Sequence, residues 1–128
     1  MSHLLIDFNT FTILGRCNRT GALGVVTATG EMAVGSRVPF VQDNLGAIAT
    51  QALTDPRLGT MGLELLSEGK NSSEVLDALI GLDPHIEARQ VGIVDSNSNT
   101  AASTGAKNSD WKGHKCGNGY VSMGNRLT

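Results

Sequence analysis

The chain has few aromatic residues. Phe, Trp and Tyr together make up 4% of its 128 residues, so Val, Leu, Ile, Ala and Met must supply most of the hydrophobic core. Long apolar stretches are also absent, because no run reaches the roughly 18 residues that a membrane-spanning helix requires. The sequence has no basic cluster, and its net charge is −2. Since Lys and Arg supply most of the affinity for nucleic acid backbones, we expect neither nucleic acid nor membrane among the partners.

Cysteine and histidine are sparse and scattered. Cys17 and Cys116 lie far apart and form no Cys-x-x-Cys pair, and His3, His85 and His114 stand alone. We therefore expect no metal site, and because no phosphate-binding loop is present either, we expect no cofactor. The first residues lack the basic segment and long apolar stretch of a secretory signal. This favours a cytoplasmic protein, with free thiols rather than a disulfide.

The sequence does contain a succession of short apolar segments separated by turn residues. Hydrophobic residues make up 40% of the chain, and its length suits one domain. The segments predict strands at residues 11–16, 23–29, 46–52, 90–94 and 100–104, with a glycine-rich loop and strand over 111–125. Two helices are expected between the third and fourth of these strands. This order differs from the regular alternation of a parallel sheet and predicts an α+β fold with a mostly antiparallel sheet.

Local signals mark both predicted helices. The first begins near Pro56, where the missing N–H costs least, and stops at Gly69. The second opens with Asn71 and with Glu74 three residues later, which is the pattern of a capping box. Pro84 closes that helix.

Thr10 begins the first predicted strand and is a candidate nucleophile. A free α-amine titrates near pH 8, so an N-terminal threonine can use its own amine as the base for its hydroxyl. Nine residues precede Thr10 in this chain. Either they are removed, or this chemistry is blocked.

Nine short segments in the same order resemble one known family. They lie at residues 10–13, 24–26, 33–39, 46–52, 62–66, 89–95, 103–105, 111–114 and 119–120 with 124–125. On these segments the chain resembles the domain of unknown function 1028 family, which is grouped with the N-terminal nucleophile (Ntn) hydrolases.

The resemblance implies an αββα sandwich, in which two antiparallel sheets pack face to face between helical layers. It suggests hydrolysis of an amide bond in a small molecule or peptide. Residues 10–128 would form the Ntn-hydrolase-like domain and residues 1–9 an extension or propeptide, so that self-cleavage after Asn9 would expose Thr10. Family chains usually continue past the Gly124-Asn125 motif, so the sandwich is expected to be incomplete here. We therefore expect a second copy or a companion chain to cover its exposed face.

Three residues are predicted to carry the reaction. Thr10 would be the nucleophile, and Thr12, on the same strand face, would support it or be the reactive group itself. Asn125 would stabilise the developing oxyanion. For each residue an ordinary structural role is the alternative: a β-branched strand residue for the two threonines and a turn residue for Asn125.

Four further residues are predicted to contact substrate: Ser36, Gln51, His114 and Arg16. Ser36 is also a suitable turn residue, and Gln51 a suitable buried amide. His114 could equally make a structural hydrogen bond, and Arg16 could form a surface ion pair or hold a carboxylate. The alternative to an amidohydrolase is a non-catalytic binding or assembly protein on the same fold, because a fold does not guarantee its chemistry.

Overall fold

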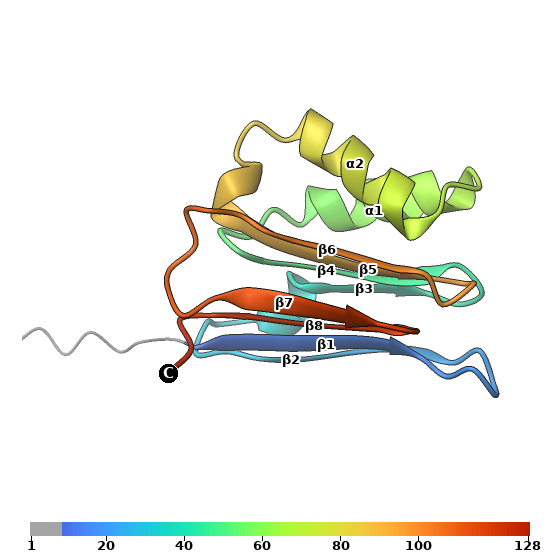
Figure 1. Ribbon diagram of the computed structural model, residues 1–128, viewed down its shortest axis with the longest axis horizontal. Coiled ribbons are helices and arrows are strands. Elements are labelled where there is room, and N and C mark those ends of the chain that lie inside the picture. Colours follow the sequence, from blue (N-terminus) through green and yellow to red (C-terminus); the bar gives the residue numbers. More distant parts are fainter. Residues whose placement is uncertain (1–8) are drawn as a thin grey trace, which may run out of the picture.

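The computed structural model describes residues 9–128, which form two stacked sheets with two helices on one side (Figure 1). The strands are β1 (Thr10–Arg16), β2 (Leu23–Ala28), β3 (Pro39–Gln42), β4 (Gly46–Ala52), β5 (Arg89–Asp95), β6 (Thr100–Thr104), β7 (Gly113–Gly117) and β8 (Tyr120–Asn125). The helices are α1 (Arg57–Ser67) and α2 (Ser72–Leu82), with single 3-10 turns at Val34–Ser36 and Ile86–Ala88. The predicted α+β class, with a helix pair between two groups of strands, is confirmed. β3 lies outside the predicted strands, and residues 111–125 form two strands rather than one.

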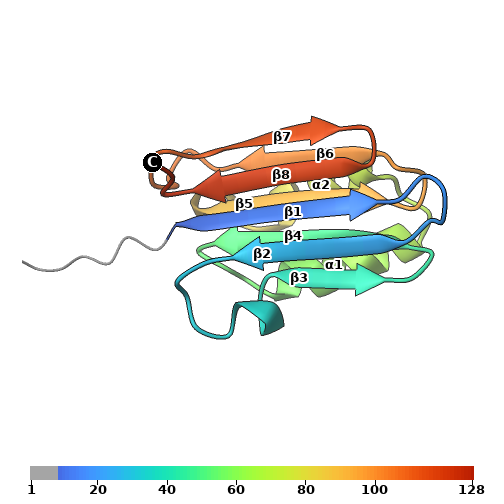
Figure 2. The same ribbon diagram turned by 90° about the horizontal axis from the view of Figure 1, so that it is seen from below.

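Both sheets are four-stranded and antiparallel. One has the order β3-β4-β5-β6 and carries both helices, so we call it the covered sheet. The other has the order β2-β1-β8-β7, and we call it the open sheet. Its two hairpins, one from each end of the chain, join where β1 pairs with β8. The first and last strands of the domain therefore lie side by side at the centre of one sheet (Figure 2).

The two helices begin and end where the local signals predict. Asn71 caps α2, since its side chain accepts from the Glu74 N–H at 3.0 Å while the Glu74 carboxylate accepts from the Asn71 N–H at 3.2 Å. Gly69 follows α1 with a positive φ of 93°, a conformation that glycine adopts without steric cost. Ser72, the first residue of α2, donates from its N–H and its hydroxyl to the Asp95 carboxylate.

Asp95 also caps the turn after β5. Its other carboxylate oxygen accepts the N–H groups of Asn97 and Asn99. Burial raises the pKa of this carboxyl, but the hydrogen bonds from Ser72, Asn97 and Asn99 together outweigh burial and lower the pKa below its ordinary value. One carboxylate thus ties the start of α2 to the β5–β6 turn.

Small residues let the two sheets approach each other. A side chain at Gly92 on β5 would come within 3.1 Å of Leu14 and Val121 of the open sheet. Ala47 and Ala49 on β4 belong to the same intersheet core. A second core, which contains Ile48 and Leu79, fills the space between the covered sheet and the helices.

The structure has one helical layer where the αββα prediction requires two. Within residues 9–128, no helix lies on the outer face of the open sheet (Figure 2). That face exposes large apolar side chains: Phe11, Ile13, Val26 and Tyr120. A covering chain was predicted because such an apolar face would be exposed, and the structure shows this exposed face. The covering chain itself stays a prediction.

Candidate functional site

Two adjoining pockets open at the end of the sandwich where β1 begins and β8 ends. The smaller pocket has a volume of about 150 Å³, and the larger has about 310 Å³. They share the wall formed by Thr10, Glu31, Ala52 and Leu53. Thr10, the predicted nucleophile, therefore lies at the boundary between two spaces that a ligand can fill.

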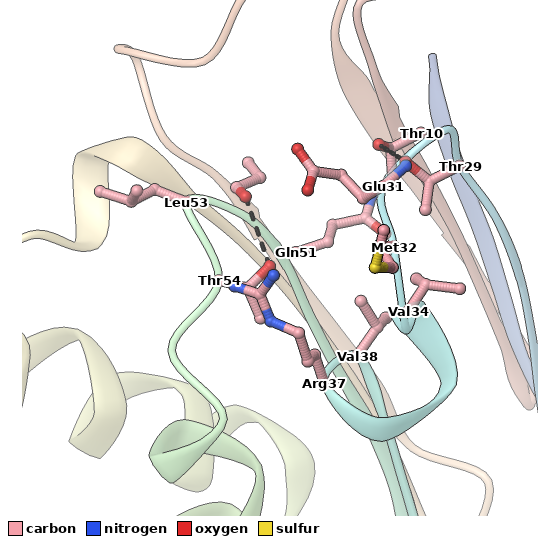
Figure 3. Close-up of a pocket in the computed structure, with 11 residues that line it drawn as sticks. Thr10, Thr29, Glu31, Met32, Val34, Arg37, Val38, Gln51, Leu53 and Thr54 are labelled. Carbon is pink, nitrogen blue, oxygen red and sulfur yellow. Dashed lines mark hydrogen bonds between the residues drawn. The ribbon is translucent and has the colours of Figure 1, made fainter. Parts of the chain in front are cut away.

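The smaller pocket is mixed in character. Its apolar lining residues are Met32, Val34, Val38, Ala52 and Leu53, and its polar ones are Thr10, Thr29, Glu31, Arg37, Gln51 and Thr54. In Figure 3 the two threonines at 10 and 29 lie on one wall, with Leu53 and Thr54 on the other.

The Thr10 side chain is held in place. Only 7% of the residue is exposed, and its hydroxyl lies 2.9 Å from the Thr29 hydroxyl. Thr29 also accepts the N–H of Glu31 at 3.3 Å, which fixes the start of the segment that lines the smaller pocket. Thr10 therefore has a defined orientation, and its hydroxyl has no carboxylate or imidazole partner within residues 9–128.

Thr12 lies one step deeper, in a buried polar network between the sheets. Its hydroxyl donates to the Gln51 side-chain oxygen, so the hydroxyl of Thr27, 2.8 Å away, must donate to Thr12. Thr12 is 0% exposed and shares no hydrogen bond with Thr10. Its environment suits a positioning role better than attack on a substrate.

Gln90 is the centre of this network. Its side-chain oxygen accepts from Gln51 at 2.8 Å and from Asn125 at 2.9 Å. Its amide nitrogen donates to the Thr104 hydroxyl and to the carbonyls of Gly113 and Gly124. Gln90 thus joins the covered sheet to β7 and β8 through one side chain.

Asn125 reaches the site from β8, directly opposite Thr10 in the β1–β8 register. It lines the larger pocket, and one hydrogen of its amide nitrogen is used by Gln90. The second amide hydrogen has no partner among the described residues and remains able to donate. Asn125 is therefore placed beside Thr10 as the predicted oxyanion donor requires, and that role stays a prediction.

Two residues of the larger pocket have left-handed backbone. Ala52 and Arg126, which line the larger pocket, have φ values of 71° and 52°. Residues with side chains rarely adopt this left-handed conformation, because it costs about 1 kcal/mol or more. Ala52 ends β4 and Arg126 directly follows β8, so both lie where a central strand stops at the pocket wall.

A buried ion pair supports the loop after β4. Arg89 pairs with Asp83, and it also donates to the Leu53 carbonyl in the loop that forms the shared pocket wall. The hydrogen bond from Arg89 lowers the pKa of the Asp83 carboxyl below its ordinary value, so the pair stays ionised at neutral pH.

The structure brings four of the seven predicted residues together and separates the other three. Thr10, Thr12, Gln51 and Asn125 lie at the two pockets or in the network below them. Ser36 is exposed and donates to the Ala33 carbonyl, a local turn bond.

The other two predicted residues lie farther away. His114 is on β7, with Nδ1 2.8 Å from the Thr104 hydroxyl. Arg16 is at the far end of β1, where it donates to Ser98. For Ser36 and His114 the structure favours the local roles that were their alternatives. Arg16 bonds to the Ser98 hydroxyl, and among the described residues it forms no ion pair.

Sequence reasoning missed several residues of the pocket walls. Glu31, Arg37, Lys107, Ser109 and Arg126 all lie in loops that follow strands. Each loop belongs to a different part of the sequence, and only the two sheets bring them to one end. Their one common signal is position just after a strand, where binding residues often gather.

Cys17 was expected to be a free thiol. It is free and exposed, as is Cys116. Hydrogen bonds from the Thr20 side chain and from the backbone of Thr20 and Arg19 lower the pKa of the Cys17 thiol from 9.0 to about 7. Because the thiolate is the reactive form, Cys17 should react rapidly at neutral pH.

We expect iodoacetamide to alkylate Cys17 with a rate that rises through a midpoint near pH 7. The measurement follows the mass of a Cys116→Ala protein from pH 5.5 to 9. Replacing Thr20 with Val removes the largest cause of the lowered pKa and should move the midpoint upward. An alkylation midpoint near pH 9 in the protein that keeps Thr20 would contradict the lowered pKa of Cys17.

Within residues 9–128, no three His, Cys, Asp or Glu side chains group as metal ligands. In the same residues, no helix is long and apolar enough to cross a membrane.

Comparisons with known proteins support the fold. The model of a family of unknown function, DUF1028, matches residues 10–128. The crystal structure of a DUF1028 protein from Silicibacter pomeroyi is similar, with a TM-score of 0.88 and 32% identity over 93% of this chain and 53% of that one. This chain thus spans about half the length of that structure. No curated protein matches it.

Proposed function

The chain belongs to the DUF1028 family of unknown function, and on that premise we propose that it hydrolyses an amide bond with Thr10 as the nucleophile. The observation that carries this proposal is the position of Thr10. It starts a central strand, lies at the mouth between two antiparallel sheets, and faces two pockets. We also propose that the complete fold is the Ntn-hydrolase sandwich, with a second helical layer over the open sheet.

The reaction needs a base, and the α-amine of Thr10 is the group in reach. It takes the proton of Oγ1 as that oxygen attacks the amide carbonyl carbon. The second amide hydrogen of Asn125 donates to the oxyanion, and the leaving amine takes up the proton. Water then hydrolyses the Thr10 ester by the same route and releases the acid.

This chemistry requires a free amine at Thr10. In the sequence its nitrogen forms a peptide bond with Asn9, and a peptide nitrogen is not a base at neutral pH. The proposal therefore includes cleavage between Asn9 and Thr10, with residues 1–9 as the propeptide.

We expect purified protein to yield a species that begins at Thr10. Intact mass and N-terminal sequencing, before and after long incubation, measure this directly. Ser36→Ala is the matched control, because that exposed hydroxyl lies outside the pockets and should leave processing unchanged. A single species that keeps Met1 and does not change with time would contradict the N-terminal threonine mechanism.

The alternative proposal is a protein that binds a ligand in the same pockets, or assembles with partners, without chemistry. The peptide bond to Asn9 favours it, since binding needs no free amine. Cytoplasmic location and coverage of the open sheet by a second copy or companion chain also stay predictions. Coverage of the open sheet is supported by its exposed apolar side chains, which are Phe11, Ile13, Val26 and Tyr120.

A further inference from the structure

The two pockets on either side of Thr10 differ in charge and polarity. Met32, Val34, Val38 and Leu53 give the smaller pocket an apolar wall. The larger pocket has none of the first three and is lined instead by Lys107, Asn108, Ser109, Asn125 and Arg126, beside the four shared residues and Ala88. The smaller pocket therefore suits the more apolar part of a ligand that fills both pockets, and the larger pocket suits the more polar part.

The polar pocket is positively charged. Lys107 and Arg126 line it, and neither forms an ion pair within residues 9–128. Glu31, on the shared wall, is the one acidic residue that lines either pocket among these residues. Arg37 adds a further positive charge at the smaller pocket. The cations outnumber the acid, so the field at the site favours an anion.

We propose that the ligand is an N-acylated amino acid, with its acyl group in the smaller pocket and its carboxylate on Lys107 and Arg126. This proposal rests on the proposed function, because it places the amide carbonyl between the two groups, at Thr10. A guanidinium matches a carboxylate with two parallel hydrogen bonds, and a lysine adds a point charge beside it.

The volumes fit a ligand of this class. A cavity of about 150 Å³ holds a group the size of benzene. The larger pocket leaves room for an amino acid and its bound water. Hydrolysis breaks the amide C–N bond, adds the hydroxyl of water to the acyl carbon and a proton to the nitrogen, and releases a carboxylic acid and an amino acid.

Binding of two matched probes tests the charge directly. N-benzoylglycine and N-benzoylglycinamide share the benzoyl amide and differ in one carboxylate. We expect the full chain, titrated by NMR at low salt, to bind the acid at least about tenfold more tightly than the neutral amide. Raising the salt concentration should weaken binding of the acid alone.

Variants locate the carboxylate. Lys107→Gln and Arg126→Gln should each weaken binding of N-benzoylglycine about fivefold, the modest loss expected for exposed charges. Glu31→Gln should strengthen binding about twofold, because it removes the acid from the shared wall. Lys115→Gln is the matched control: this exposed lysine lies on β7, outside both pockets, and its removal should change nothing.

The outcomes separate this inference from the proposed function. Equal affinity for the two probes would overturn the inference even if the protein hydrolyses amides. So would equal effects of Lys107→Gln and Lys115→Gln on binding of the acid. Selective binding of the acid without hydrolysis would support the inference and count against the proposed function. Each variant should keep the thermal midpoint of the parent, since both cations are exposed.

Discussion

A Thr10→Ala variant that begins at residue 10 is expected to lose amide hydrolysis by at least about a thousandfold. Removal of the nucleophile leaves only binding and oxyanion stabilisation, which accelerate the reaction far less. The measurement compares hydrolysis of N-benzoylglycine by proteins cut to begin at residue 10, with Thr or Ala there. Because Thr10 contributes one hydroxyl contact, to Thr29, the variant should stay folded.

Thr10→Ser is the matched control and should retain most of the activity, since it keeps both the hydroxyl and the α-amine. A further control is Thr12→Val, which removes the neighbouring hydroxyl from the same strand face. It should reduce activity through the Gln51 network while leaving the pH dependence of the reaction in place. Equal hydrolysis by the Ala and Thr proteins would contradict the assignment of Thr10.

Gln90→Leu is expected to destabilise the fold by about 4 kcal/mol or more. The substitution leaves the buried side-chain donors of Gln51 and Asn125, the buried carbonyl of Gly124 and the part-buried carbonyl of Gly113 without their Gln90 partner. Each unpaired buried polar group costs about 1–3 kcal/mol, so the sum is a large part of a typical domain's stability. Urea unfolding followed by circular dichroism measures the loss.

Gln42→Leu makes the same chemical change at an exposed position of β3 and should shift stability by no more than about 0.5 kcal/mol. A Gln90→Leu protein as stable as Gln42→Leu would show that the network adds nothing to the joining of the sheets. Partial unfolding confined to β7 and β8 would instead mean that Gln90 holds only that hairpin.

The elements that sequence reasoning predicted are those with local signals. The Asn71–Glu74 capping box, Pro56 and Gly69 each act within a few residues, so the helix bounds followed from short stretches of sequence. Strands β1 and β2 and the turn after β5 were predicted for the same reason. Apolar residues mark the two strands, and a run of polar residues marks the turn.

An incomplete sandwich was expected, but which of its layers would be missing was harder to predict. The αββα expectation came from a resemblance to longer chains, and residues 9–128 contain helices for only one face. The pattern of β1 already puts Phe11 and Ile13 on the face opposite Thr10 and Thr12. Apolar residues on both faces of a strand predict that both faces are buried. They do not show whether the same chain or another chain covers each face.

The site depends on pairings that no local pattern contains. Thr10 and Asn125 stand near opposite ends of the sequence and become neighbours only because β1 pairs with β8. Ala52 and Arg126 adopt left-handed backbone, although neither Ala nor Arg favours it. The cationic pocket was missed because Lys107 and Arg126 are ordinary surface residues until the two sheets place them together.

The pairing of β1 with β8 also has a consequence for synthesis of the protein on the ribosome. β1 has only β2 beside it until β8 has been made, because β8 occupies its other edge. Contacts between such distant segments form slowly, and an unpaired central strand invites association with other chains. Thr10 therefore enters its final surroundings only after β8 has been made, and any cleavage that depends on those surroundings must follow the synthesis of β8.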